Sequence, residues 1–173
     1  MDIHKYIRDV ADFPKEGIVF KDITPLLANI EALRETVDQL ITPFKDKGID
    51  IVTGVESRGF IFGTIVADKL NAGFVPIRKP NKLPAETISE TYDLEYGSDT
   101  VEIHTDAIKP GQKVLMVDDL IATGGTMAAA CNLVERLGGE IVAAAFVIEL
   151  SFLAGREKLS KWDVHSLIQV DGE

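Results

Sequence analysis

The chain has 173 residues, of which 46% are hydrophobic and 27% are charged, and its formal net charge is −10. This length and balance predict a single globular domain with a sizeable core. The negative charge argues against a general nucleic-acid or membrane surface, although one pocket can still be positive. The single cysteine, Cys131, excludes an intrachain disulfide and a cysteine-rich zinc site, and it fits a reducing cytoplasm. No apolar run approaches the length of about 18 residues that indicates a membrane span.

The N-terminal part combines a short predicted helix with an irregular apolar segment. Apolar residues at helical spacing predict the helix over residues 2–12. Pro14, Gly17 and Pro25 then prevent a long regular element, yet residues 13–20 include several large apolar side chains. Such a segment is either a plug of the core or a lid over a flat ligand, and composition alone favours the plug.

The next region begins with a helix that has a packing role. A packing helix is predicted over residues 30–47, with Asn29 as its N-cap, Gly48 as its stop and a kink at Pro43.

A buried strand at residues 50–55 leads through Glu56, Ser57 and Arg58 into an apolar helix at 60–70. Helix N–H groups and a guanidinium together bind phosphate oxygens, but an arginine in a surface salt bridge fits this turn equally well.

A basic cluster follows the strand predicted over residues 74–77. It consists of Arg78, Lys79 and Lys82, and its place at a strand end in an acidic chain favours a ligand role over a solvated loop. Residues 79–99 are polar and contain several proline, serine and threonine residues, which predicts a long, mobile loop of functional importance. Alternating apolar residues then predict a half-exposed strand.

The most informative stretch is residues 113–126, which read KVLMVDDLIATGGT. The apolar run at 114–117 predicts a buried parallel strand, and Asp118 and Asp119 come where that strand should end. The glycines at 124–125 allow the following turn to close on an anion at a helix N-terminus. Like charges about 4 Å apart repel by roughly 4 kcal/mol at a dielectric near 20, so the acids should face sugar hydroxyls, a developing positive charge or a metal. A phosphate site beside acids that face sugar hydroxyls matches a ribose 5-phosphate as the ligand.

The remaining elements complete an α/β pattern. A helix with a buried Cys131 is predicted up to Gly138, and buried strands are predicted at residues 140–149 and 164–170. Alternating strands and helices predict a mostly parallel central sheet flanked by helices, with right-handed crossovers. The anion-binding turns then lie together at one end of the sheet.

Four segments resemble one known family. VDDLIATGGT resembles the phosphoribosyl-pyrophosphate (PRPP) signature of the type I phosphoribosyltransferases, and its continuation ATGGTM resembles the adenine enzymes of that family. The resemblance covers residues 13–159 and includes, in family order, FPKEGIVFKDI, ESRGF and ELSFLAGREKL. It implies a Rossmann-like type I phosphoribosyltransferase fold in a single domain, 1–173, with a small N-terminal hood over about residues 1–28 and a flexible catalytic loop.

The resemblance also implies how the base and the pyrophosphate bind. Phe20 would stack on the purine, while the backbone at Val19 and Lys21 would bind its edge. Lys21 departs from the arginine that many relatives carry, and lysine neither stacks nor forks as arginine does. The turn at Glu56 and Ser57 would bind pyrophosphate and contain a cis peptide bond between those two residues.

Further roles follow from the same resemblance. Glu95, beside Tyr96, matches the acid that handles the imidazole proton of the purine, whereas composition alone makes it one more exposed acid. Asp118 and Asp119 would hold the ribose hydroxyls and stabilise positive charge on the sugar. The residues expected at the 5-phosphate are Ala122, Thr123, Gly124, Gly125 and Thr126, and the cations expected at the pyrophosphate are Arg58, Arg78, Lys79 and Lys82.

The implied reaction converts adenine and PRPP into AMP and pyrophosphate. Mg²⁺ would arrive with PRPP or pyrophosphate and lie near Asp118 and Asp119, without dedicated protein ligands. A cytoplasmic homodimer with no nucleic-acid or membrane partner is expected. Two alternatives remain open: a transferase for hypoxanthine, guanine or xanthine, and a PRPP-sensing regulator that binds RNA or DNA without catalysis.

Overall fold

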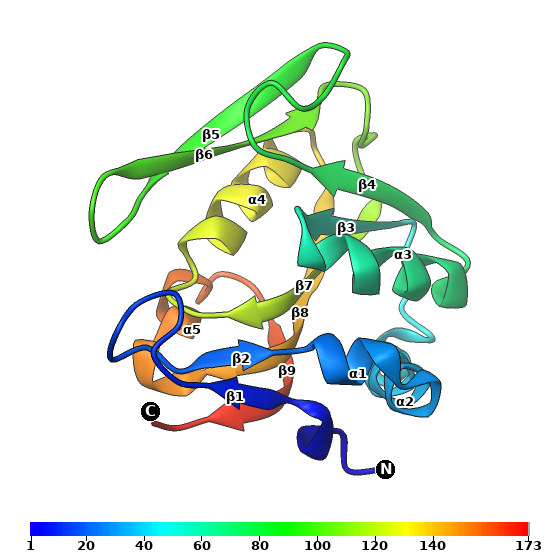
Figure 1. Ribbon diagram of the computed structural model, residues 1–173. Helices are drawn as coiled ribbons and strands as arrows, with labels where there is room; N and C mark the ends of the chain where they lie inside the picture. The colour runs from blue at the N-terminus through cyan, green and yellow to red at the C-terminus, as the bar shows by residue number, and fades with distance from the viewer. Residues whose placement is uncertain (173) are drawn as a thin grey trace.

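A five-stranded parallel sheet forms the centre of the molecule (Figure 1). The computed structural model describes residues 1–172. The strands lie in the order β4-β3-β7-β8-β9, and adjacent strands are all parallel. This arrangement confirms the predicted α/β class with a mostly parallel central sheet. The strand bounds are β3 (Ile51–Val55), β4 (Gly73–Ile77), β7 (Lys113–Ile121), β8 (Glu140–Leu150) and β9 (Val164–Val170).

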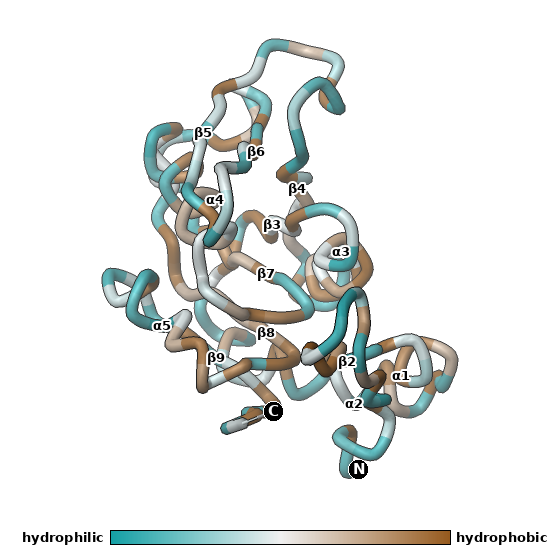
Figure 2. The backbone as a smooth tube through the Cα atoms, turned by 60° about the vertical axis from the view of Figure 1, so that its left-hand side comes forward, coloured by the Kyte–Doolittle hydropathy of each residue, from teal (hydrophilic) through white to brown (hydrophobic). Residues whose placement is uncertain are grey.

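Helices cover both faces of this sheet because its central strands are apolar on both sides. Helices α2 (Ile30–Ile41) and α3 (Arg58–Leu70) share one buried cluster with the sheet, and α4 (Gly125–Arg136) shares the other. Close approach of α3 requires glycine, since a Cβ on Gly54 would lie only 2.6 Å from the carbonyl oxygen of Gly59. Figure 2 shows the apolar residues concentrated along the central strands and the hydrophilic ones along the outer loops.

The predicted helix and strand patterns of the central region are confirmed. The side chain of Asn29 accepts hydrogen bonds from the backbone N–H groups of Glu31 and Ala32, as expected of an N-cap. At Pro43 the α-helix gives way to a 3-10 turn, η2 (Thr42–Phe44). Cys131 is a free, buried residue of α4. None of the helices in residues 1–172 is both long and apolar enough to cross a lipid bilayer.

The helix predicted over residues 2–12 is wrong. Only a 3-10 turn forms there, η1 (Ile3–Tyr6), and the chain then extends as β1 (Arg8–Val10). This strand pairs antiparallel with β2 (Phe20–Asp22), and cross-strand pairs such as Arg8–Asp22 support it. The strand pairing, together with burial of Ile3 in the core, overrides the helical spacing. A short helix, α1 (Thr24–Ala28), leads back to the core.

The prediction that residues 79–99 form one long loop is wrong from Thr87 onward. Strands β5 (Thr87–Asp93) and β6 (Ser98–His104) form an antiparallel hairpin that lies along α4 (Figure 1). Ile88 and Tyr92 pack against the core cluster from alternate positions of β5. Arg136 on α4 donates a hydrogen bond to the carbonyl oxygen of Ser89 at 2.7 Å. The polar composition hid a half-buried strand, and the expected mobility of this segment stays a prediction.

Candidate active site

Strand β7 extends further than its apolar run indicates. It pairs with β8 as far as Ile121, opposite Glu149, so Asp118 and Asp119 lie inside the strand and not after its end. Continued pairing with the long strand β8 explains the difference. Asp119 is buried, with 4% of its surface exposed, and Asp118 is partly buried. The strand geometry therefore holds both carboxyl groups rigidly at the carboxyl end of the sheet.

A cavity of about 230 Å³ opens at this end of the sheet, between the β3–α3 turn and the β7–α4 loop. Two turns that are far apart in the sequence meet here, as expected at the carboxyl ends of parallel strands. The structure thus brings most of the predicted site residues together. Those that line the cavity are Glu56, Ser57, Arg58, Lys79, Asp118, Asp119, Ala122, Thr123, Gly124, Gly125 and Thr126.

The segment that leads from β7 into the first turn of α4, residues 122–126, has the form of an anion site, and we refer to it as the phosphate loop. Gly124 has a φ of 81° and occupies the N-cap position of α4, a conformation that favours glycine. The first N–H groups of a twelve-residue helix face this loop and carry the positive end of its dipole. A phosphate group fits these donors without a protein side chain of opposite charge.

The acid pair lies in a strongly perturbed environment. Burial raises the pKa of Asp118 well above its usual range, and the charge of Asp119 raises it further. Burial also raises the pKa of Asp119, although the guanidinium of Arg58 opposes this. Arg58 Nε lies 2.9 Å from Asp119 Oδ2, yet that buried oxygen has no aligned hydrogen bond. The pair therefore has unused capacity for hydroxyl donors or positive charge.

The β3–α3 turn has the expected cis peptide bond between Glu56 and Ser57. The carboxylate of Glu56 has partners within the protein. Its Oε1 accepts a hydrogen bond from the backbone N–H of Lys79 at 2.5 Å and lies 3.4 Å from Arg78 Nε. Glu56 thus joins this turn to the end of β4, and its backbone, not its carboxylate, is free to face an anion.

A polar cluster links the cavity to the hairpin. The ammonium group of Lys79 contacts the carboxylate of Asp99 and lies 3.2 Å from the hydroxyl of Tyr92. Burial alone would lower the pKa of Lys79, but these hydrogen bonds outweigh burial and raise it. The Thr126 hydroxyl donates to the Tyr92 hydroxyl at 3.0 Å. The sequence patterns did not indicate Tyr92 or Asp99, and only the alternation along β5 signals that Tyr92 faces inward.

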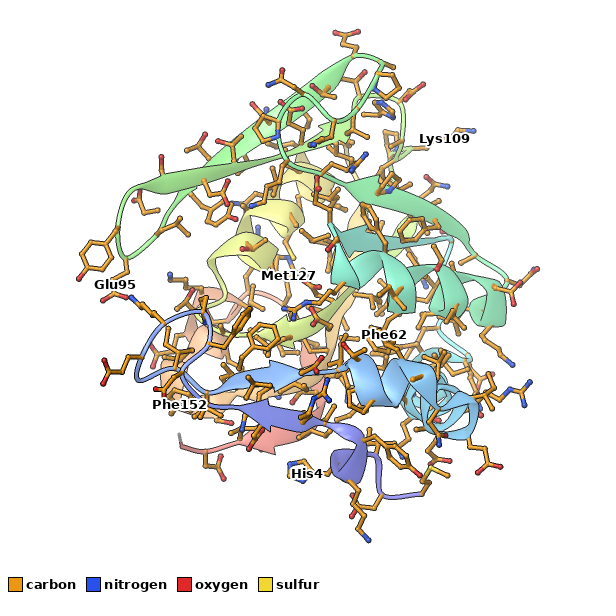
Figure 3. All side chains as sticks on the ribbon, viewed as in Figure 1. His4, Phe62, Glu95, Lys109, Met127 and Phe152 are labelled. Carbon is orange, nitrogen blue, oxygen red and sulfur yellow. The ribbon has the colours of Figure 1, made fainter. Side chains whose placement is uncertain are left out.

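Some predicted residues lie outside the cavity. Glu95 and Tyr96 form the exposed tip of the hairpin, where Tyr96 is 82% exposed. Figure 3 shows Glu95 at this tip, away from Met127, which lines the cavity. Lys82 is exposed, and Arg78 packs its guanidinium 5.7 Å from the ring of Phe60. Arg78 lies beside the cavity, since its Nε is 3.4 Å from Oε1 of Glu56, whereas contact of Lys82, Glu95 and Tyr96 with a ligand stays a prediction.

Comparison with known proteins identifies the family. The model of the phosphoribosyl transferase domain matches residues 20–171. An adenine phosphoribosyltransferase of Clostridium novyi is 57% identical over 171 residues, which cover 99% of both chains. The chain belongs to the adenine phosphoribosyltransferase family.

Solved structures of the family agree with this assignment. The adenine phosphoribosyltransferase of Rhodothermus marinus has a TM-score of 0.93 and 53% identity, and the match covers 97% of this chain and 96% of that one. The enzyme of Saccharomyces cerevisiae, in complex with adenine and an imino sugar bisphosphate, has a TM-score of 0.91 and 44% identity over 96% of each chain.

The hood of this family member lies beside the cavity. The ring of Phe20 packs edge-on against Phe13 at a centroid distance of 5.2 Å, and the guanidinium of Arg58 lies 5.2 Å from the Phe20 ring centroid. Arg58 therefore connects Phe20 with the acid pair. Lys21 Nζ donates to Asp9 Oδ1 at 2.8 Å, so its side chain is engaged within the hood. Val19 is half-buried just before β2.

Proposed function

We propose that this chain transfers the 5-phosphoribosyl group from PRPP to adenine, giving AMP and pyrophosphate. The observation that carries the proposal is the phosphate loop beside a buried aspartate pair, in a chain 57% identical to an adenine phosphoribosyltransferase. The similar yeast enzyme binds adenine together with a phosphorylated imino sugar. A purine and a phosphorylated sugar are the two ligands that the cavity and the hood are suited to hold.

The phosphate loop binds the 5-phosphate and thereby fixes the reacting carbon of the sugar. Its donors are the backbone N–H groups of residues 122–126 and the hydroxyl of Thr123, joined by the hydroxyl of Thr126 when it turns from Tyr92 to the phosphate. A remote group that orients a reactant lowers the barrier by about 7–11 kcal/mol in favourable cases. In this proposal the loop supplies orientation and takes no part in bond breaking.

The acid pair stabilises the sugar while the bond to pyrophosphate breaks. Positive charge then develops on the ribose ring, and preorganised carboxylates near it lower the energy of the transition state. Asp119 Oδ2, which lacks an aligned hydrogen bond, accepts from a ribose hydroxyl. Asp118 Oδ1 accepts the backbone N–H of Asp119 at 2.8 Å, which orients the first carboxylate for the same task.

The pyrophosphate is held by the β3–α3 turn and by cations. Arg58 and Lys79 line the cavity, and Arg78 and Lys82 join them when the loop after β4 closes. Residues 1–172 contain no group of three or more acidic, histidine or cysteine side chains for a metal. Asp118 and Asp119 would lie near an Mg²⁺ that arrives with PRPP or pyrophosphate, and their carboxylate oxygens are the ligand type that this ion prefers. Mg²⁺ bound with pyrophosphate would neutralise the negative charge of this leaving group.

Adenine stacks on Phe20 and accepts hydrogen bonds from, or donates them to, the backbone at Val19 and Lys21. Glu95 handles the imidazole proton of the base, as a general base or as a hydrogen-bond acceptor. The hairpin carries Glu95 to the base and keeps water from the sugar cation. Adenine attack through nitrogen then completes AMP.

The experiment that tests the function measures pyrophosphate release from PRPP with adenine, guanine, hypoxanthine and xanthine, each with Mg²⁺ and with EDTA. Release that requires adenine and Mg²⁺ is expected. Faster turnover of another purine would favour the first alternative. Binding of PRPP without release of pyrophosphate would favour the regulator, and Asp119→Asn should abolish turnover only in an enzyme.

The assembly we propose is a homodimer of single-domain chains, 1–173, located in the cytoplasm. The hood, about residues 1–28, shares a core cluster with the sheet through Ile3, Ile23 and Leu26, which supports one domain. Exposed apolar side chains such as Phe13 and Phe152 offer surface that a second copy would cover. Light scattering should give twice the chain mass of 18.9 kDa, and the single mass would contradict the dimer.

A further inference from the structure

The segment after β8 packs directly against the back of the phosphate loop. It comprises η3 (Ser151–Leu153) and the short helix α5 (Gly155–Lys158). A Cβ on Gly155 would lie 2.4 Å from the carbonyl oxygen of Ala122 and 3.1 Å from the nitrogen of Gly124. Conversely, a Cβ on Gly124 would lie 2.3 Å from the carbonyl oxygen of Gly155. Backbone touches backbone here, so the loop cannot shift independently of Gly155.

The residue after Gly155 fixes its position. Arg156 donates to both carboxylate oxygens of Glu149, from Nε at 2.6 Å and from Nη2 at 2.7 Å. It also donates to the carbonyl oxygen of Val164 at 2.8 Å and to Ser166 Oγ at 3.0 Å. The fork-shaped guanidinium makes such a bidentate contact both strong and directional. Arg156 therefore joins α5 to β8 and β9 at once.

The carboxylate that receives Arg156 is itself firmly placed. Glu149 is only 5% exposed, and Ser166 Oγ donates to its Oε2 at 2.5 Å. In the β7–β8 register Glu149 lies opposite Ile121, the last residue of β7 before the phosphate loop. Neither Glu149 nor Arg156 lines the cavity. Any influence of the pair on a bound ligand must pass through Gly155 and the loop backbone.

We propose that Gly155, held in place by the Glu149–Arg156 pair, is a positioning residue for the phosphate loop and sets its affinity for the 5-phosphate of PRPP. The inference rests on the proposed function, because it assigns the support of that same site. It also gives a role to the segment ELSFLAGREKL, for which the reaction itself requires no side chain. A structural role alone would stabilise the fold and leave phosphate affinity unchanged.

The sharpest variant is Gly155→Ala. Gly155 has no positive φ, and alanine is a good residue for a helix start, so the variant should fold. The added Cβ displaces Ala122 or Gly124, and displacement of about 1 Å raises the KM for PRPP by about 10- to 100-fold. The KM for adenine should stay the same. Calorimetry with ribose 5-phosphate should show the same loss of affinity without any turnover.

A matched control is the neighbouring substitution Ala154→Gly. Ala154 has a φ of 53°, which glycine adopts more readily, so this variant should be at least as stable as the wild type. Its KM for PRPP should equal that of the wild type. A rise as large as that of Gly155→Ala would show that any change in this segment has the effect, and it would overturn the proposal.

A second variant, Arg156→Lys, covers the case in which Gly155→Ala does not fold. Lysine keeps the charge but loses the bidentate contact, so the KM for PRPP should rise on the order of fivefold. A lower melting temperature with unchanged KM for PRPP and unchanged ribose 5-phosphate affinity would overturn the inference. Failure of the proposed function would give a different result, because wild-type protein would then release no pyrophosphate. The affinity of Gly155→Ala for ribose 5-phosphate would still test the role of Gly155 in that case.

Discussion

The phosphate loop lines the cavity and the β5–β6 hairpin contacts this loop through Tyr92 and Thr126, but the two are held in different ways. The loop is fixed by backbone contacts, with Gly124 packed against Gly155 and both glycines buried. The base of the hairpin is anchored by the buried side chains of Val101 and Ile103 and by hydrogen bonds such as Arg136 to the Ser89 carbonyl, whereas its tip at Glu95 is exposed.

This difference matches two needs of the reaction. A hairpin tip without buried contacts opens at low cost, whereas close-packed backbone does not. The 5-phosphate needs a fixed partner throughout the reaction. In the proposed mechanism the hairpin tip with Glu95 has to admit adenine first and approach it afterwards. Four substitutions test this division between a fixed and a closing part.

The largest effect is expected at the hairpin tip. Glu95→Gln should lower kcat by about 10²- to 10⁴-fold, because an amide cannot take the imidazole proton. The melting temperature should not change, since Glu95 is exposed and has no partner among residues 1–172. Steady-state kinetics measure kcat, and thermal melts measure the melting temperature. The control is Asp93→Asn in the same hairpin, and equal activity of Glu95→Gln and wild type would remove Glu95 from the mechanism.

A substitution in the phosphate loop should lower kcat/KM for PRPP. Gly124→Ala places a Cβ 2.3 Å from the Gly155 carbonyl oxygen at a φ of 81°, so the loop must move. We expect kcat/KM for PRPP to fall about 100-fold. Gly97→Ala, at a φ of 84° in the open hairpin turn, is the matched control for backbone conformation. A Gly124→Ala enzyme no worse than this control would show that the loop is not rigid.

Asp118 should lower the free energy of unfolding of the ligand-free enzyme. Because burial raises the pKa of Asp118, the folded protein binds a proton that the unfolded chain has already lost, and stability falls as pH rises through that interval. Asp118→Asn removes this penalty, so it should be about 1–2 kcal/mol more stable than wild type near neutral pH but nearly inactive.

Urea unfolding at about pH 4 and about pH 8 measures this effect. The stability difference between Asp118→Asn and wild type should grow with pH. A difference that is the same at both pH values would mean that Asp118 titrates normally. Asp106→Asn, which changes an exposed acid far from the cavity, controls for the loss of one negative charge.

The smallest effect is expected where the two parts meet. Tyr92→Phe removes the hydroxyl that contacts both Thr126 and Lys79 and keeps the ring. The loss of such hydrogen bonds costs about 0.5–1.5 kcal/mol, which should appear as a few-fold lower kcat/KM. Protease cleavage of the hairpin should also become faster. Unchanged cleavage would show that other contacts hold the hairpin to the loop.

The sequence predicted the parts of the site that depend on local chemistry. A buried apolar run followed by two acids and two glycines has few structural solutions, so the order of strand, glycine turn and helix α4 was predicted correctly, although the strand continues to Ile121. Phosphate binding by the turn stays a prediction. The cis bond between Glu56 and Ser57, which the family resemblance implied, is also present. In these segments neighbouring residues determine the conformation.

The misses depend on partners that are distant in the sequence. Residues Arg8–Val10 form a strand only because Phe20–Asp22 lies beside them, and β7 continues past Val117 only because β8 is long. The hairpin strands are polar on one side, which composition alone assigns to a loop. The contacts of Tyr92 with Lys79 and Thr126 join three elements, and no spacing along the chain encodes them.

The burial of the single thiol has a practical consequence. Desolvation raises the pKa of Cys131 to about 12, so its reactive thiolate is almost absent at neutral pH. A cysteine introduced at the exposed Tyr96 position would then be the one thiol that a maleimide dye labels. Fluorescence from such a dye would test directly whether the hairpin opens and closes, in a chain that is otherwise unchanged.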